Sequence, residues 1–112
     1  MTAKVWNKRD PNVPPGAVYV GRPSKLGNPF TIGWRNNMRE DVVMKFFNYL
    51  FNQENLYEDI RALKGKDLVC WCAPQLCHAD VLLALANKQI PPTGDRDLIG
   101  WKRLLNLVWG EE

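Results

Sequence analysis

Residues 67–88 read DLVCWCAPQLCHADVLLALANK, and this run changes midway from a strand pattern to a helix pattern. Its first six residues are mostly apolar, which is typical of a buried strand. From residue 77 to 88 the apolar side chains recur at helical spacing, and the buried stripe would be Val81, Leu82, Leu85 and Ala86. A strand that leads directly into a helix is the building unit of α/β proteins. The run therefore predicts an α/β fold with a loop at the carboxyl end of a strand, where such folds place their sites.

Other segments extend this fold on both sides. A short strand is predicted over residues 3–9 and a buried strand over residues 17–20. A helix is expected to start near Met38, with Asn36 or Asn37 as its cap, and a second helix to cover residues 54–63 before Gly65 ends it. The tail over residues 97–109 shows a further helical stripe. The side chains expected to be buried in these three helices are Val43, Phe46, Phe47, Leu50, Phe51; Leu56, Ile60, Leu63; and Leu98, Trp101, Leu105, Val108.

The order of these elements predicts how the sheet is connected. A strand–helix–strand unit that joins Val18 to Val69 is expected to be a right-handed crossover between parallel strands. We therefore expect a single domain over residues 1–112, with a small two- or three-layer Rossmann-like fold, a short and mostly parallel sheet, and a C-terminal helix. In a parallel sheet the loops after residues 20 and 72 leave from the same edge. If the two strands are neighbours, these loops form the walls of one crevice.

Composition and charge limit the classes of function. Of the 112 residues, 46% are hydrophobic, and no apolar run is long enough to span a membrane. The first nine residues lack the apolar core of a signal peptide, and three cysteines are an odd number, so a cytoplasmic protein with free or metal-bound thiols is expected. Residues 1–35 carry six basic and one acidic side chain, whereas the remainder carries nine basic and eleven acidic ones. The basic first third suits an anionic partner.

All three cysteines and the single histidine fall within nine residues of one another. Such a set could close a tetrahedral zinc site, although the spacing is not that of a zinc finger. Alternatively, a cysteine at a helix N-terminus has a lowered pKa, so Cys77 or Cys72 could act as a nucleophile with His78 or Asp80 assisting it. A third interpretation is that a cysteine in a buried strand only packs. The expected metal ligands are Cys70, Cys72, Cys77 and His78, and the expected catalytic residues are Cys77 and Asp80.

The loop over residues 21–30 contains the residue types found in anion-binding sites, although it does not match a known phosphate-binding loop. Its glycines permit close backbone approach, its two cations supply charge, and an aromatic ring at its end could stack on a ligand ring. The alternative is a tight structural turn. The expected ligand-binding residues are Gly21, Arg22, Ser24, Lys25, Gly27, Asn28 and Phe30.

The two motifs occur together in a known family. The segments Val18-Tyr19-Val20-Gly21-Arg22 and Gly27-Asn28-Pro29-Phe30, followed by residues 63–82, resemble the domain-of-unknown-function family 4326. That family is frequent in phages and also occurs in bacteria, and it has no established activity. The resemblance covers about residues 4–88, so residues 1–90 are expected to be a family-like core and residues 91–112 a helical extension. It implies that the two motifs act together, in the host cytoplasm if a phage encodes the chain.

Two classes of function remain open on these grounds. The first is binding of an anionic, nucleotide-like or sugar-phosphate ligand in the crevice, where the protein either acts on the ligand or sequesters it. The second is a zinc-stabilised module that binds nucleic acid or protein without catalysis. We rank nucleic acid below the small molecule because the basic charge is modest and not gathered on one helix. The C-terminal helix packs on the sheet, forms a homodimer seam or docks a partner; no membrane partner is expected.

Overall fold

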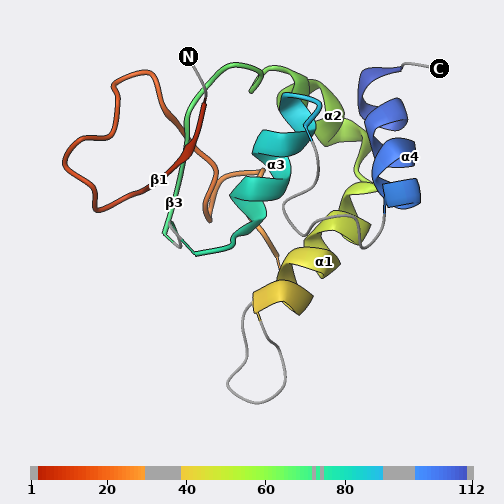
Figure 1. Ribbon diagram of the computed structural model, residues 1–112, viewed down its shortest axis with the longest axis horizontal. Helices are drawn as coiled ribbons and strands as arrows, with labels where there is room; N and C mark the ends of the chain where they lie inside the picture. The colour runs from red at the N-terminus through yellow and green to blue at the C-terminus, as the bar shows by residue number, and fades with distance from the viewer. Residues whose placement is uncertain (1–2, 30–38, 72, 74, 90–97, 111–112) are drawn as a thin grey trace.

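The structure is a computed structural model and describes residues 3–29, 39–71, 73, 75–89 and 98–110. It is a mixed α/β fold with a small parallel sheet followed and covered by helices (Figure 1). The described elements, in chain order, are β1 (Val5–Asn7), β2 (Val18–Tyr19), α1 (Arg39–Leu50), α2 (Glu54–Arg61), β3 (Leu68–Cys70), α3 (His78–Ala86) and α4 (Leu98–Trp109).

The last strand in the sequence is the central strand of the sheet. β3 pairs in parallel with β1 on one side and with β2 on the other, so that Trp6 and Tyr19 both lie opposite Val69. The ladder continues past β2, where the backbone N–H of Val20 donates to the carbonyl of Val69. The predicted parallel pairing of the segments around Val18 and Val69 is therefore confirmed. The loops after β2 and β3 leave from one edge of the sheet.

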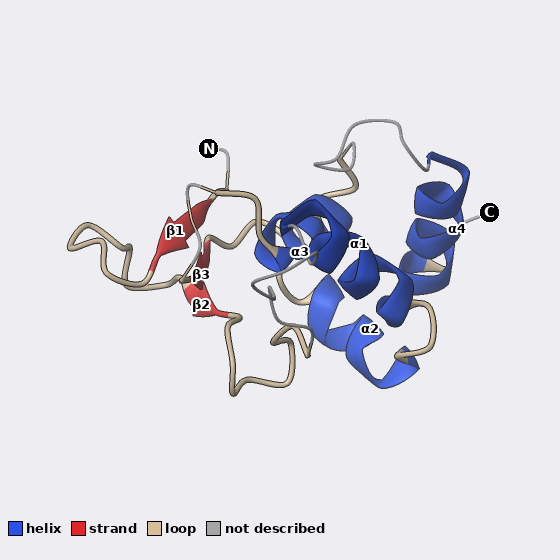
Figure 2. Cartoon of the chain, turned by 90° about the horizontal axis from the view of Figure 1, so that it is seen from below, coloured by secondary structure: helices blue, strands red, loops and turns tan. Residues whose placement is uncertain are grey.

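The helices gather on one side of the strands, and the connection from β1 to β2 lies on the other side (Figure 2). Because strand side chains alternate between faces, Leu68 and Cys70 point into the core under the helices, whereas Val69 points away and is not part of that core. Helix α3 packs directly on β1 and β3, α1 and α2 pack on α3, and α4 packs on α2. The sheet thus has a helix-covered face and a face without helices among the described elements.

The two middle helices bury the faces that the apolar spacing predicts. In α1 the side chains of Val43, Phe46, Phe47 and Leu50 are buried, and in the second helical region those of Leu56, Ile60 and Leu63 are buried. Phe51, also predicted to be buried, lies just past the end of α1 and is only partly buried. Helix α2 ends at Arg61, earlier than the predicted stop at Gly65, because turn bonds from the N–H groups of Leu63 and Lys64 to Ile60 and Arg61 replace the helical ones. The turn then reaches Gly65, whose φ of 78° is a left-handed conformation that glycine adopts without strain. The caps proposed at Asn36 and Asn37 lie outside the residues that the structure describes.

The tail forms the predicted helix, but this helix buries a somewhat different face from the predicted one. Its buried side chains are Trp101, Leu104 and Val108, whereas Leu98 is 39% exposed. The predicted stripe is therefore wrong at Leu98, omitted Leu104 and included Leu105, which is only partly buried, because contact with α2 selects the face that is buried. Trp101 stacks on Phe47, with ring centroids 5.8 Å apart. Each helix in the described part of the chain is too short or too polar to cross a lipid bilayer.

Candidate functional site

A histidine joins the two loops at the carboxyl edge of the sheet. The Nε2 atom of His78, the first residue of α3, lies 2.7 Å from the carbonyl oxygen of Val20, the residue after β2. The imidazole is only 8% exposed and meets the ring of Phe46 edge-on, with centroids 5.1 Å apart. Its Nδ1 atom faces the Sγ atom of Cys77 at 3.4 Å. The ring is therefore held from three sides, and the glycine–arginine loop starts against the cysteine–histidine run.

Electrostatics also connect these two loops. Burial lowers the pKa of His78 below 6.5, the hydrogen bond with Val20 opposes this effect, and the charge of Arg22 adds to it. The guanidinium of Arg22 thus acts on the imidazole across the edge of the sheet, although Arg22 itself is exposed to solvent. A neutral imidazole fits this position, because a cation there would face both low dielectric and a second positive charge.

The cysteine thiols lie under the helices. The Sγ atoms of Cys70 and Cys77 are 2.9 Å apart, and both side chains are buried. Cys72, the third expected zinc ligand, lies outside the described residues. Within the described segments, no three His, Cys, Asp or Glu side chains take an arrangement that could hold a metal ion. Zinc therefore stays a prediction.

The two expected catalytic residues form the start of α3. Cys77 is the N-cap residue: its Sγ atom accepts a bond from the backbone N–H of Ala79, and its own N–H donates to Asp80 Oδ2 at 2.9 Å. This reciprocal arrangement is a capping box. Burial raises the pKa of Asp80, while the bond from Cys77 opposes the rise. The fold thus uses both side chains to begin the helix, and Cys77 is only 3% exposed.

The glycine–arginine loop is a series of tight turns. The backbone N–H of Ser24 donates to Gly21, and that of Gly27 donates to Ser24. The hydroxyl of Tyr19 donates to the carbonyl of Arg22 at 2.6 Å. A Cβ atom added at Gly21 would lie 2.5 Å from that hydroxyl, so this glycine makes room for the tyrosine ring. The sequence predicts that another group approaches the backbone closely at Gly21. In the structure that group is the side chain of Tyr19.

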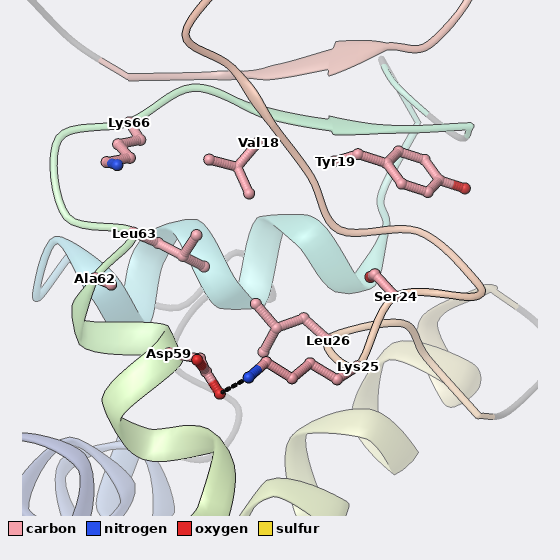
Figure 3. Close-up of a pocket in the computed structure, with 9 residues that line it drawn as sticks. All are labelled: Val18, Tyr19, Ser24, Lys25, Leu26, Asp59, Ala62, Leu63 and Lys66. Atoms are coloured by element: carbon pink, nitrogen blue, oxygen red, sulfur yellow. Dashed lines mark ion pairs between the residues drawn. The ribbon is translucent and has the colours of Figure 1, made fainter.

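The far side of the same loop faces α2. Lys25 forms an ion pair with Asp59 at 3.1 Å, beside a cavity of about 320 Å³ (Figure 3). The hydroxyl of Ser24 also lines this cavity and, among the residues described, has no hydrogen-bond partner. Apolar side chains from β2, the loop and α2 complete the wall: Val18, Leu26, Ala62 and Leu63. The structure therefore separates the two cations of the loop, with Arg22 near His78 and Lys25 beside α2.

Three residues of this region were missed by the sequence reasoning. Tyr19 supports the turn after β2, and the side-chain amide of Asn7 donates to the carbonyls of Trp71 and Ala73 at 3.1 and 2.8 Å. The Nε1 atom of Trp71 donates to the hydroxyl of Tyr19 at 3.0 Å. Strand alternation could have placed Tyr19 and Trp71 on one face. Within the glycine–arginine loop, Asn28 is buried, whereas Phe30 lies outside the described residues.

Comparisons with known proteins give a family and a viral relative. Residues 4–88 match the family model described as Domain of unknown function (DUF4326). The chain is also 34% identical over 86 residues to the "Uncharacterized protein R718" of Acanthamoeba polyphaga mimivirus. That alignment covers 61% of this chain and 65% of the viral protein. No solved structure matches. Helix α4 begins beyond the matched residues.

Proposed function

This chain belongs to the family of Domain of unknown function (DUF4326), and on the geometry of its two joined loops we propose that it binds an anionic small molecule at the carboxyl edge of the sheet. The ligand class we favour is a nucleotide-like or sugar-phosphate molecule. The proposal takes the sheet to be Rossmann-like, with the parallel pair β2 and β3 as its support.

One observation carries this proposal: the contact between His78 and Val20 holds the loop of Arg22 against the first turn of α3. A helix N-terminus presents backbone N–H groups and a partial positive charge, and a guanidinium binds an oxyanion bidentately. The charge of Arg22 already reaches His78, so it also reaches this turn. Two sources of positive potential therefore meet at one edge, and an anion placed between them would be attracted by both.

We favour binding over catalysis. A nucleophilic Cys77 must meet its substrate, yet its side chain is 3% exposed and its Sγ atom contacts Cys70 at 2.9 Å. A general acid or base at Asp80 must exchange a proton with the substrate, yet its carboxylate accepts a bond from the backbone of Cys77. Chemistry at either residue would require the start of α3 to open.

The experiment is a ligand screen with two matched variants. Nucleoside monophosphates and sugar phosphates would be tested by thermal shift and calorimetry on the wild type, Arg22→Ala and Lys25→Ala. Both variants remove one positive charge from the same loop, but Lys25 pairs with Asp59 on the far side. We expect Arg22→Ala to weaken binding about tenfold or more, because charge-assisted bonds are the strong ones, and Lys25→Ala to change it much less.

The opposite order would refute this site. If Lys25→Ala abolished binding and Arg22→Ala did not, the ligand would lie in the cavity beside α2. If no phosphate ligand bound the wild type, the proposal would fail. Circular dichroism of each variant shows whether the loss reflects unfolding.

The alternative is a zinc-stabilised binding module, and one observation favours it. The Nδ1 atom of His78 faces Cys77, Cys77 faces Cys70, and Nε2 of His78 is held by the carbonyl of Val20. Metal-binding histidines commonly have their second nitrogen fixed by such a carbonyl. Native mass spectrometry would reveal a bound zinc ion as an excess of about 65 Da, removed by a chelator. A protein of apo mass, purified with zinc supplied, would contradict this alternative.

A further inference from the structure

The face of the sheet that lies away from the helices carries a regular set of side chains. Alternation along each strand places every second residue on this face, and the register aligns Trp6, Val69 and Tyr19 in a row. Lys4 and Lys8 flank Trp6 by the same alternation, and Trp71 follows Val69. We call this surface the aromatic face, and it consists of Lys4, Trp6, Lys8, Arg9, Tyr19 and Trp71. Val69 is buried beneath it, and Trp6 and Tyr19 are partly buried.

Trp71 is held in place although it is half exposed. Its ring is 50% exposed, while its Nε1 atom donates to the hydroxyl of Tyr19 at 3.0 Å. That hydroxyl in turn donates to the carbonyl of Arg22, so the tyrosine ring is fixed as well. An indole left in water forgoes the free energy of burial. The hydrogen bond from Nε1 of Trp71 to the Tyr19 hydroxyl, which is itself bonded to Arg22, orients this indole before any partner binds. Such an arrangement is preorganised for stacking.

Cations surround these rings. The Nζ atom of Lys8 lies 4.7 Å from the ring centroid of Tyr19 and 6.0 Å from that of Trp71. The guanidinium carbon of Arg9 lies 5.4 Å from the Trp71 centroid, and Nζ of Lys4 lies 3.9 Å from the Trp6 centroid. All three cationic residues are exposed. A flat ring that replaced a cation on Trp71 would free that cation for a phosphate beside it.

We propose that the aromatic face binds single-stranded nucleic acid. Aromatic side chains that stack bases, next to cations that follow the backbone, are the two components of such sites. The face offers both, with three cationic residues. The carboxylate of Asp67, the residue before β3, accepts a bond from the backbone N–H of Lys4, and that of Asp10, the residue after Arg9, accepts one from the backbone N–H of Asn12. An acidic peptide would use the charge but leave the exposed indole without a stacking partner. A duplex hides its base faces, so it would use the cations alone.

This inference stands apart from the proposed small-molecule site. It rests on the face of the sheet away from the helices, whereas the anion site rests on the start of α3 under the other face. The same sheet thus carries two candidate surfaces, and the bond from Tyr19 to Arg22 connects them. Failure of one proposal leaves the other to be judged on its own measurement.

The test is fluorescence anisotropy with a labelled oligothymidylate of about 20 nucleotides, which exceeds the site size of a small binding domain. At about 50 mM salt we expect saturable binding that weakens steeply as salt is raised to about 200 mM. Trp71→Ala should weaken binding about tenfold, the effect of losing one stacked base. Lys8→Ala should reduce the slope of log affinity against log salt by about 0.7, the value for one phosphate contact on a single strand.

The matched control is Lys64→Ala, which removes a cation placed 5.7 Å from another indole, that of Trp109, among the helices. It should leave binding unchanged. Absence of binding at about 50 mM salt would overturn the inference, as would equal affinity for a duplex of the same length or stronger competition by polyglutamate. Unchanged affinity in both Trp71→Ala and Lys8→Ala would also overturn it. Thermal melting of each variant shows whether the fold is lost. Its binding of nucleoside monophosphates shows whether the anion site is lost.

Discussion

His78 and Val20 lie 58 residues apart in the chain, yet the Nε2 atom of the histidine is 2.7 Å from the valine carbonyl. The contact links the first residue of α3 to the residue that follows β2. It fixes the distance between the two loops that make up the candidate anion site. A side chain from the central strand–helix unit thus sets the position of an edge strand.

This histidine predicts how stability depends on pH. Because burial lowers the pKa of His78 below its ordinary 6.5, the unfolded chain binds more protons than the folded one in the window just below that value. The free energy of unfolding should therefore fall as pH decreases through about 6.5. His78→Gln should flatten this part of the curve. Urea denaturation at a series of pH values measures it, and an unchanged slope in the variant would assign the dependence to other groups.

Asp80 should act as a helix cap. Removing the carboxylate in Asp80→Ala leaves the N–H of Cys77 without this acceptor and should cost about 1 kcal/mol of stability, the usual effect of losing a cap. Since burial raises the pKa of Asp80, the wild-type carboxylate also lowers stability as pH rises above its ordinary 3.8, opposite in sign to His78. Denaturant melts of Asp80→Ala and Asp80→Asn test both points. Wild-type stability in Asp80→Ala would rule out the cap.

Gly21→Ala should move Tyr19. The added Cβ atom would lie 2.5 Å from the tyrosine hydroxyl, so the ring must shift and its bonds with Arg22 and Trp71 must weaken. We expect a loss of about 1–3 kcal/mol, as for overpacking, and a changed tryptophan fluorescence spectrum. Gly16→Ala is the control, because nothing lies within 4 Å of its Cβ position. Equal effects from the two substitutions would contradict this reasoning.

Trp101 should be a core residue. It is 2% exposed, stacks on Phe47 and donates from Nε1 to the carbonyl of Gln89 at 2.9 Å. Trp101→Ala should cost about 3–5 kcal/mol, which is a large part of the stability of a small domain. Leu107→Ala, on the exposed side of the same helix, should change stability little. Chemical denaturation measures both, and similar small effects would show that α4 does not stabilise the fold.

Several features of the fold follow from local pattern. The apolar spacing at Phe46, Leu50 and Ile60 predicts helices that bury these residues, as observed. The helix stop expected at Gly65 comes earlier in the structure: α2 ends at Arg61, and the left-handed backbone of Gly65 belongs to the turn that follows. Parallel pairing followed from the order of the elements, because a strand–helix–strand unit returns in the same direction.

The candidate site depended more on distant contacts. From the sequence, Arg22 and Lys25 were equivalent loop cations, but Asp59 on α2 pairs with only one of them. Cys77 and Asp80 are residue types that can serve as a nucleophile and an acid. In the structure both side chains cap the start of α3. Asp59 lies far from Lys25 along the chain, whereas the contact between Cys77 and Asp80 is local and is a capping box.

The sequence by itself determined the helices, the parallel order of the strands and the fact that two unusual loops share one edge, because periodicity and chain direction are local properties. Only the tertiary structure decided which face of the sheet the helices cover, which loop cation faces His78, and that Trp71 stands exposed beside Tyr19, Lys8 and Arg9. Alternation assigns residues to two faces, but it does not say which one is covered. That choice comes from the packing of α3, whose partners lie far away in the chain.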